Sequence, residues 1–265
     1  DFERSRYSEI SSLSVDSNYE RSNADVTEEY QLFQSDLIYP VLNNGRIETG
    51  IRSQWRNMNN QFGFSEQSGT DWISPSRFND IFNYDEQVHA AYLMGSSQFG
   101  KLGVQAGVRT EYTIVETIQE SNSETINKNY TNFFPSLAVS YKNNESQTFQ
   151  LSYSKRIRRP GQWDLMPFMK FGDNRAMRVG NPDINPELTH VVEAGWMQYF
   201  SKGSLLSSIY YRRTTDKIER MSEVGSDGII YSIPMNIANR DAGGLELNAT
   251  YNPANWLRFT SGFNF

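Results

Sequence analysis

The chain reads LGVQAGVRTEYTI over residues 102–114, and this stretch decides the fold. Apolar or aromatic side chains occupy nearly every second position from Leu102 to Ile114, and glycine or polar residues stand between them. Side chains on a β-strand point alternately to the two faces of a sheet. The segment therefore predicts a strand with one apolar face and one polar or bare face.

The same alternation predicts about ten strands along the chain. The clearest further examples cover residues 136–141, 148–157, 245–251 and 257–265, and weaker ones cover 30–39, 47–55, 88–94, 192–200 and 205–213. Their lengths suit tilted strands that cross a bilayer, each of which needs roughly 9–11 residues.

The connections between these strands alternate between short and long. Short turns are expected at residues 42–45, 98–100, 143–146, 201–203 and 252–255, and polar loops at 57–83, 116–130 and 159–188, with a shorter one at 223–228. Short turns at one end and longer loops at the other are typical of outer-membrane barrels. We therefore predict an all-β fold of antiparallel, up-and-down transmembrane β-barrel strands.

The composition favours a thin wall over a packed globular core. Hydrophobic residues make up 37% of the chain and aromatic residues 14%, whereas soluble domains are about 45–50% apolar and disordered chains have few aromatics. The sequence has no cysteine, which excludes disulfides, thiolate zinc sites and cysteine nucleophiles. A net charge of −6 argues against nucleic-acid binding, because phosphate contacts need clustered Lys and Arg.

Aromatic residues recur near the predicted strand ends. They favour an aromatic girdle at each membrane surface, although aromatics are also good strand formers in general. The residues concerned are Tyr39, Trp55, Tyr92, Tyr112, Tyr141, Tyr199, Phe200, Trp256 and Phe259.

A resemblance to a known family rests on the second half of the chain. The sequence reads SKRIRRP over residues 154–160, WDLMPF over 163–168 and RVGNPDINPELT over 178–189, and Glu193-Ala194-Gly195 follows. These segments, with the later Asn239, Gly244 and Glu246, resemble the barrel of TonB-dependent receptors, particularly the Bacteroidetes-type outer-membrane β-barrel family. Ile184 stands where the family more often has Leu.

The resemblance implies a barrel of about 22 strands in the bacterial outer membrane, filled by a plug that binds the TonB complex. It implies uptake of a scarce ligand, such as an iron chelate, cobalamin, a glycan or a peptide, with outer-membrane lipid and a surface lipoprotein as further partners and no cofactor. We expect residues 1–265 to be one segment of such a wall, without a plug. Residues 1–27 would be a loop or an unassigned strand, and 28–265 successive hairpins.

Three groups of candidate site residues follow. The rim motif Gly180, Asn181, Pro182, Pro186 and Glu187 is rigid, since proline fixes φ, and is either a structural staple or a ligand contact. The polar set Arg52, Arg109, Glu111, Glu193, Glu246 and Arg258 is expected to face the lumen, as contacts for a plug or ligand or as a hydrated wall with ion pairs. The loop set Trp72, Phe78, Trp163, Phe168, Arg158 and Arg159 is expected to bind ligand, to meet lipopolysaccharide phosphate, or only to fold the loops.

No catalytic or metal site is predicted. His89 and His190 lie in separate strands without neighbouring ligands at metal-binding spacing, so packing is the expected role and we do not expect an enzyme.

Two rival hypotheses remain. The aromatic ending at Phe259, Phe263 and Phe265 also suits a small self-contained outer-membrane barrel acting as an adhesin, pore or lipid enzyme, and the third possibility is a soluble all-β binding module.

Overall fold

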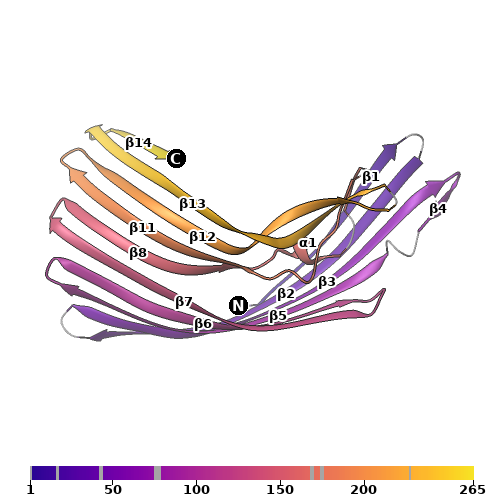
Figure 1. Ribbon diagram of the computed structural model, residues 1–265, viewed down its shortest axis with the longest axis horizontal. Coiled ribbons are helices and arrows are strands. Elements are labelled where there is room, and N and C mark those ends of the chain that lie inside the picture. Colours follow the sequence, from indigo (N-terminus) through magenta and orange to yellow (C-terminus); the bar gives the residue numbers. More distant parts are fainter. Residues whose placement is uncertain are drawn as a thin grey trace.

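The computed structural model describes residues 2–15, 18–41, 44–74, 79–167, 170–173, 176–226 and 228–265. In this part of the chain a 14-stranded sheet forms a curved trough, in which the long strands lie side by side (Figure 1). The elements are β1 (Phe2–Val15), β2 (Asn18–Val41), β3 (Gly45–Ser68), β4 (Asp71–Ile73), β5 (Asp80–Phe99), β6 (Leu102–Gln119), β7 (Glu124–Asn144), β8 (Gln147–Arg158), α1 (Gln162–Leu165), β9 (Lys170–Asp173), β10 (Ala176–Arg178), β11 (Glu187–Phe200), β12 (Gly203–Val224), β13 (Ile230–Ala254) and β14 (Leu257–Asn264).

The strand order follows the sequence. It runs β1-β2-β3-β5-β6-β7-β8-β11-β12-β13-β10-β9, with β14 also on β13 and β4 on β3. Long neighbours are antiparallel, and short turns join them at one end of the sheet, which we call the short-turn end. The opposite end, which carries the other connections and α1, is the loop end. The predicted all-β, up-and-down arrangement is confirmed.

The strands are longer than predicted toward the loop end. The expected loops at 57–83 and 116–130 are wrong, because β3 continues to Ser68, β5 begins at Asp80, and β6 and β7 meet in a short turn after Gln119. Polar residues dominate these extensions, and on β3 Asn60 interrupts the apolar face between Met58 and Phe62, so the sequence signals the strands only weakly. The polar stretch 1–27, a loop or unassigned strand by sequence, forms β1 and the first part of β2.

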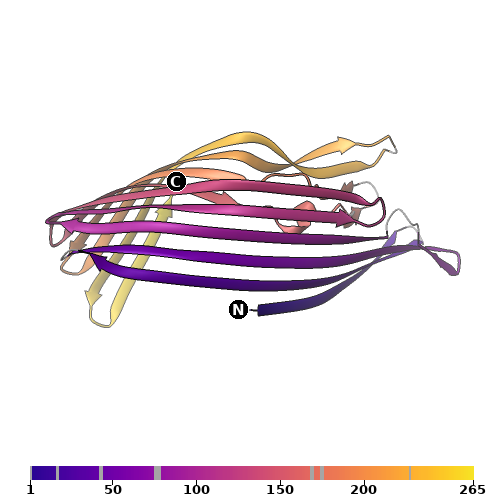
Figure 2. The ribbon, with the colours of Figure 1, turned by 90° about the horizontal axis from the view of Figure 1, so that it is seen from below.

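The register gives the sheet an apolar outer face next to the short turns. Val108 pairs with Leu93 on one side and Pro135 on the other, so these side chains share a face. Val108 is 45% exposed and Leu93 56%, and none of the other segments that the structure describes crosses the strands on this side (Figure 2). We call this surface the apolar belt. Its exposed members include Leu37, Ile51, Leu93, Val108, Phe133, Leu137, Leu151, Val192, Ile209 and Phe263.

Most of the aromatic residues at strand ends border the apolar belt. By register, Tyr39, Trp55, Tyr112, Tyr141, Phe200 and Phe259 lie on the outer face. The girdle prediction is wrong for Tyr92 and Tyr199, which point to the opposite face because they stand one position out of phase. Tyr92 there donates a hydrogen bond to Asp36 Oδ1 at 2.7 Å.

Toward the loop end polar side chains predominate on the outer face of β2, β3, β5 and β7. On β3 and β5, Asn57 Nδ2 donates to Asp85 Oδ1 at 2.5 Å and Asn59 Nδ2 to Asn83 Oδ1 at 2.7 Å. Hydrogen-bonding side chains on an exposed sheet face suit water and not hydrocarbon. The strands therefore extend past the apolar belt into an aqueous region.

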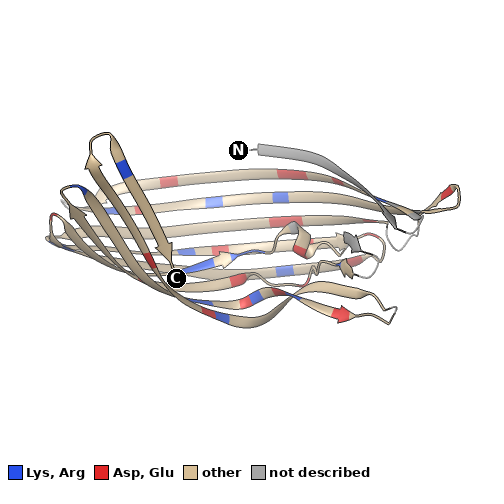
Figure 3. Cartoon of the chain, turned by 90° about the horizontal axis from the view of Figure 1, so that it is seen from above, with Lys and Arg blue, Asp and Glu red and all other residues tan. Residues whose placement is uncertain are grey.

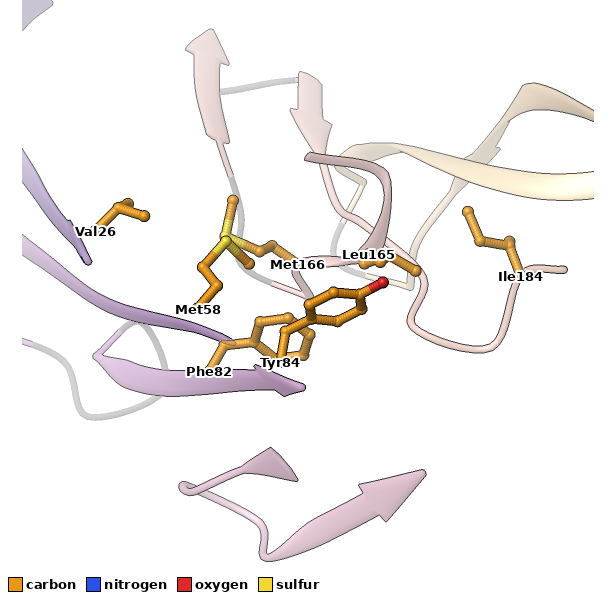
Figure 4. Close-up of a cluster of buried hydrophobic side chains, with 7 residues drawn as sticks. All are labelled: Val26, Met58, Phe82, Tyr84, Leu165, Met166 and Ile184. Carbon is orange, nitrogen blue, oxygen red and sulfur yellow. The ribbon is translucent and has the colours of Figure 1, made fainter. Parts of the chain in front are cut away.

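The hydrophobic core lies inside the trough, close to the loop end. Val26, Met58, Phe82 and Tyr84 of the sheet pack with a segment that crosses the trough (Figure 4), whose buried side chains are Leu165, Met166 and Ile184. Seen from above, α1 lies within the trough over the sheet (Figure 3). We call this concave surface the trough face. No helix in the described residues is long and apolar enough to cross a membrane.

The apolar belt generates a prediction on one strand. Leu137→Arg places a charge in the middle of the belt on β7, and Asn129→Arg places the same charge on the same face beyond the belt. We expect the free energy of unfolding from a phospholipid bilayer to fall by about 2–4 kcal/mol for Leu137→Arg and by about 0–1 kcal/mol for Asn129→Arg. Equal losses in the two variants would contradict the assignment of the belt to hydrocarbon.

Candidate functional site

A gap in strand pairing defines the site. β8 ends at Arg158 and β11 begins at Glu187, while their neighbours β7 and β12 continue toward the loop end. In the described residues, β7 pairs with β8 only from Ser136 onward, and β12 pairs with β11 only up to Thr215. The described part of the chain between β8 and β11, namely residues 159–167, 170–173 and 176–186, fills this gap and turns into the trough. We call it the inserted loop.

The second half of the inserted loop ties the two sides of the gap together. On β7, Lys128 Nζ lies 2.9 Å from Asp183 Oδ1 and donates to the Ile184 carbonyl at 3.2 Å. On β13, Asn236 accepts a hydrogen bond from the Asn185 amide at 2.7 Å and donates to the Asn185 carbonyl at 3.0 Å. The segment 180–187, which we call the strap, thus bridges β7 and β13.

Close packing and hydrogen bonds explain the residue types at the first two positions of the strap, Gly180 and Asn181. The Gly180 amide donates to the Met166 carbonyl at 2.8 Å, and a Cβ at Gly180 would lie 2.1 Å from that oxygen. Asn181 donates its amide to Asp164 O at 2.7 Å and its side chain to Pro234 O at 3.1 Å. Its Oδ1 also accepts the Asp183 amide at 2.9 Å. Only glycine fits the first position, and an Asn side chain can make both contacts at the second.

Glu187 anchors the far end of the strap. Its Oε1 accepts hydrogen bonds from Arg158 at 3.0 Å, from Lys217 Nζ at 2.9 Å and from the Ile218 amide at 3.0 Å. The Glu187 side chain is 6% exposed, whereas that of Arg158 is 61% exposed. A buried carboxylate needs such partners, because an isolated charge is costly to remove from water. Together with β8 and β12, Glu187 therefore fixes the point where the strap enters β11.

Arg159 joins the beginning of the inserted loop to the trough face. Its Nη2 donates to Glu111 Oε2 at 2.7 Å and to Thr113 Oγ1 at 2.9 Å, and its Nε lies 3.4 Å from Glu86 Oε1. Glu111 also accepts Arg109 Nε at 2.7 Å. Burial by itself lowers the pKa of the Arg159 guanidinium, but the hydrogen bond and charge of Glu111 outweigh burial and raise it. These four charged side chains form what we call the arginine–glutamate cluster.

The arginine–glutamate cluster borders a polar hollow on the trough face. The hollow has a volume of about 840 Å³ and lies between the inserted loop and the short-turn half of the sheet. Arg52, which donates to Gln54 Oε1 at 3.3 Å and to the Tyr30 hydroxyl at 3.4 Å, also borders it. The charged residues lining it whose side chains share the trough face by register are Asp36, Glu48, Arg52, Arg109, Glu111 and Arg156, and Arg159 of the inserted loop joins them. Residues of both signs make the hollow suited to a polar ligand or protein segment.

The other residues expected to face the lumen lie apart from the hollow. By register, Glu193, Glu246 and Arg258 point to the same face of the sheet as Arg109. Arg258 Nε donates to Asn252 Oδ1 at 3.0 Å, and Glu246 Oε1 accepts Asn264 Nδ2 at 3.5 Å. None of the three lines the hollow, so the predicted set divides into two groups.

The aromatic residues predicted to bind ligand are not gathered in one place. Trp72 is 49% exposed on β4, and Trp163 is 45% exposed on α1 inside the trough. Phe78 and Phe168 lie outside the described residues. Of the loop set, Arg158 and Arg159 are the members that contact other candidate residues, namely Glu187 and Glu111.

Several residues of the site carry no signal in the sequence. Glu86, Lys128, Lys217 and Asn236 become partners of the inserted loop only through the register of distant strands. His89 contacts Ser53 Oγ at 3.1 Å, and His190 contacts the Tyr153 hydroxyl at 2.9 Å. Within the described ranges no group of three or more His, Asp or Glu could hold a metal ion.

Comparison with known proteins identifies a family for the chain and solved structures with a similar fold. Residues 1–265 match the family model described as outer membrane protein beta-barrel family. No curated protein sequence matches the chain. The structure is similar to that of the copper transporter OprC, with a TM-score of 0.71 and 13% identity over all of this chain and 42% of that chain.

Two further solved structures share the fold. The ferric yersiniabactin uptake receptor FyuA from Yersinia pestis has a TM-score of 0.64 and 13% identity, over 99% of this chain and 38% of that one. The ferric citrate transporter FecA in its unliganded form has a TM-score of 0.59 and 11% identity, over 99% and 40%. The chain thus spans less than half the length of each of these proteins.

The arginine–glutamate cluster generates a prediction about stability. Arg159→Leu would leave Glu86, at 6% side-chain exposure, without its cation and Glu111, at 9%, with Arg109 alone. We expect the free energy of unfolding to fall by about 3–5 kcal/mol. The control Arg156→Leu removes an exposed arginine of the same strand end and should cost within about 0.5 kcal/mol. Equal effects in a denaturant titration would show that the cluster does not hold the inserted loop.

Proposed function

Because the chain belongs to the outer membrane protein beta-barrel family, we propose that it forms part of the wall of a TonB-dependent transporter in the bacterial outer membrane. The observation that carries the proposal is the match of the whole chain to part of the OprC barrel, at a TM-score of 0.71. FyuA and FecA support it with the same fold. All three are named as transporters or receptors and not as enzymes, and we propose no enzymatic activity for this chain.

The trough face suits a transporter in particular. The inserted loop turns inward and is fixed there by the strap, Glu187 and the arginine–glutamate cluster. A loop that folds into a lumen narrows the passage and presents side chains from a rigid support. A polar trough with charges of both signs would meet a plug domain at its base and a ligand near the loop end.

The ligand we propose is a scarce polar compound too large for simple diffusion. The neighbours are named for copper, ferric yersiniabactin and ferric citrate, and an iron chelate, cobalamin, a glycan or a peptide would each fit such a transporter. The partners in this proposal are outer-membrane lipid, the TonB complex acting through a plug, and a surface lipoprotein that delivers or covers the ligand. Trp163 and the residues lining the hollow are the proposed ligand contacts.

Two measurements on the full-length protein test the proposal. In planar bilayers a plugged transporter should show no steady ion conductance, because the plug blocks the lumen. The purified periplasmic domain of TonB should also be retained by the immobilised full-length protein. A steady conductance without TonB retention would contradict the proposal and favour a small self-contained pore.

A further inference from the structure

The outer face carries a local concentration of positive charge just beyond the apolar belt. At the polar positions just past the belt, β2, β3, β6 and β7 carry neutral or acidic side chains, namely Gln31, Asn57, Glu116 and Asn129, and β5 carries His89 followed by Gln87. The three neighbouring strands β8, β11 and β12 instead carry Lys155, His190 and Arg213. We call these three residues the basic row.

The register makes the basic row continuous. His190 pairs directly with Lys155 on one side and with Arg213 on the other, and side chains opposite each other on adjacent strands are about 5 Å apart at Cβ. Arg213 is exposed and Lys155 half-buried, and neither makes an ion pair within 4.0 Å among the described residues. Arg213 shares a hydrogen bond with the Tyr211 hydroxyl, but a guanidinium has five N–H donors, so both cations can still donate to a ligand outside the sheet.

Two tyrosines lie between the basic row and the apolar belt. Tyr153 and Tyr211 stand two residues nearer the short turns than Lys155 and Arg213, on the same face. The Tyr153 hydroxyl lies 2.9 Å from His190 Nδ1. Tyrosine prefers the boundary between hydrocarbon and headgroups, because its ring is apolar and its hydroxyl polar. The basic row thus lies at the height of the headgroups in the leaflet at the loop end.

An acidic residue, Asp241 of β13, borders the basic row next to Arg213. Asp241 of β13 stands opposite Arg213, but its Oδ1 accepts the Tyr211 hydroxyl at 2.6 Å. Tyr211 therefore holds this carboxylate, and no ion pair forms between Asp241 and Arg213 within 4.0 Å in the described structure. The net charge of the row stays positive when Asp241 is included.

We propose that the basic row binds the phosphate of an anionic lipid headgroup, such as the phosphorylated glycolipid of the outer leaflet. Arginine and lysine form short, charge-assisted hydrogen bonds to phosphate oxygens, and basic residues at a membrane surface select anionic headgroups. Val192 and Ile209 of the apolar belt lie on the short-turn side of the row, so a lipid held by its phosphate would lay its acyl chains on them. The proposal depends on the membrane location and does not depend on TonB-driven uptake.

Native mass spectrometry of the intact protein in detergent tests this site. The probe is lipid A with both phosphates, compared with chemically dephosphorylated lipid A. The double variant Lys155→Gln/Arg213→Gln should weaken binding of phosphorylated lipid A by roughly tenfold or more, since each cation near a headgroup contributes about one factor of five. The same variant should leave the weak binding of dephosphorylated lipid A unchanged.

A matched control removes the same charge at the short-turn end. Lys101→Gln/Lys202→Gln changes two lysines that contact the carbonyls of Asn143 and Pro253, and it should leave lipid A binding unchanged. Equal losses in the two double variants would overturn the site, as would equal binding of the two forms of lipid A to the unaltered protein. Displacement of lipid A by millimolar inorganic phosphate would also overturn it, because the row would then bind free phosphate.

Discussion

Every strand must pair its backbone groups and must also present an apolar face to hydrocarbon. These two requirements determine the rest of the structure. In a bilayer, unpaired amide and carbonyl groups are very costly, so a wall of strands must keep long, continuous ladders. The register from β2 to β13 does this, and it places Val108, Leu93 and Leu137 together on the outer face. Since side chains alternate, the same ladders place Arg109 and Glu111 on the trough face.

The inserted loop is the exception to continuous pairing, and its contacts show how the structure compensates. Where β8 and β11 stop short, the strap supplies side-chain and main-chain partners to β7 and β13 in place of a strand. Arg159 and Glu187 fix the two ends of the inserted loop with buried ion pairs. The Gly180, Asn181 and Glu187 positions of the motif are thus explained by close backbone approach, hydrogen bonding and ion pairing within the protein. The hollow beneath the inserted loop remains the place where a ligand or plug would meet the chain.

The sequence predicted the strands of the apolar belt well, because hydrocarbon imposes strict alternation there. It failed at 57–83 and 116–130, where polar residues weaken the pattern although the strands continue and one face of β3 and β5 packs in the core. The rim motif and Arg159 were recognisable from local sequence. Their partners Glu86, Lys128 and Lys217 were not, because those contacts depend on strand register and on the path of the inserted loop through the trough.

The central claim is that the outer face of the sheet contacts hydrocarbon and the trough face contacts water. Spin labels placed one at a time on β7 in lipid vesicles test this claim directly, by their collision rates with oxygen and with a water-soluble nickel chelate. Labels at Leu137 and Val139 should collide mainly with oxygen, and labels at Ser136 and Ala138 mainly with the nickel chelate. Equal nickel accessibility at all four positions would contradict the account.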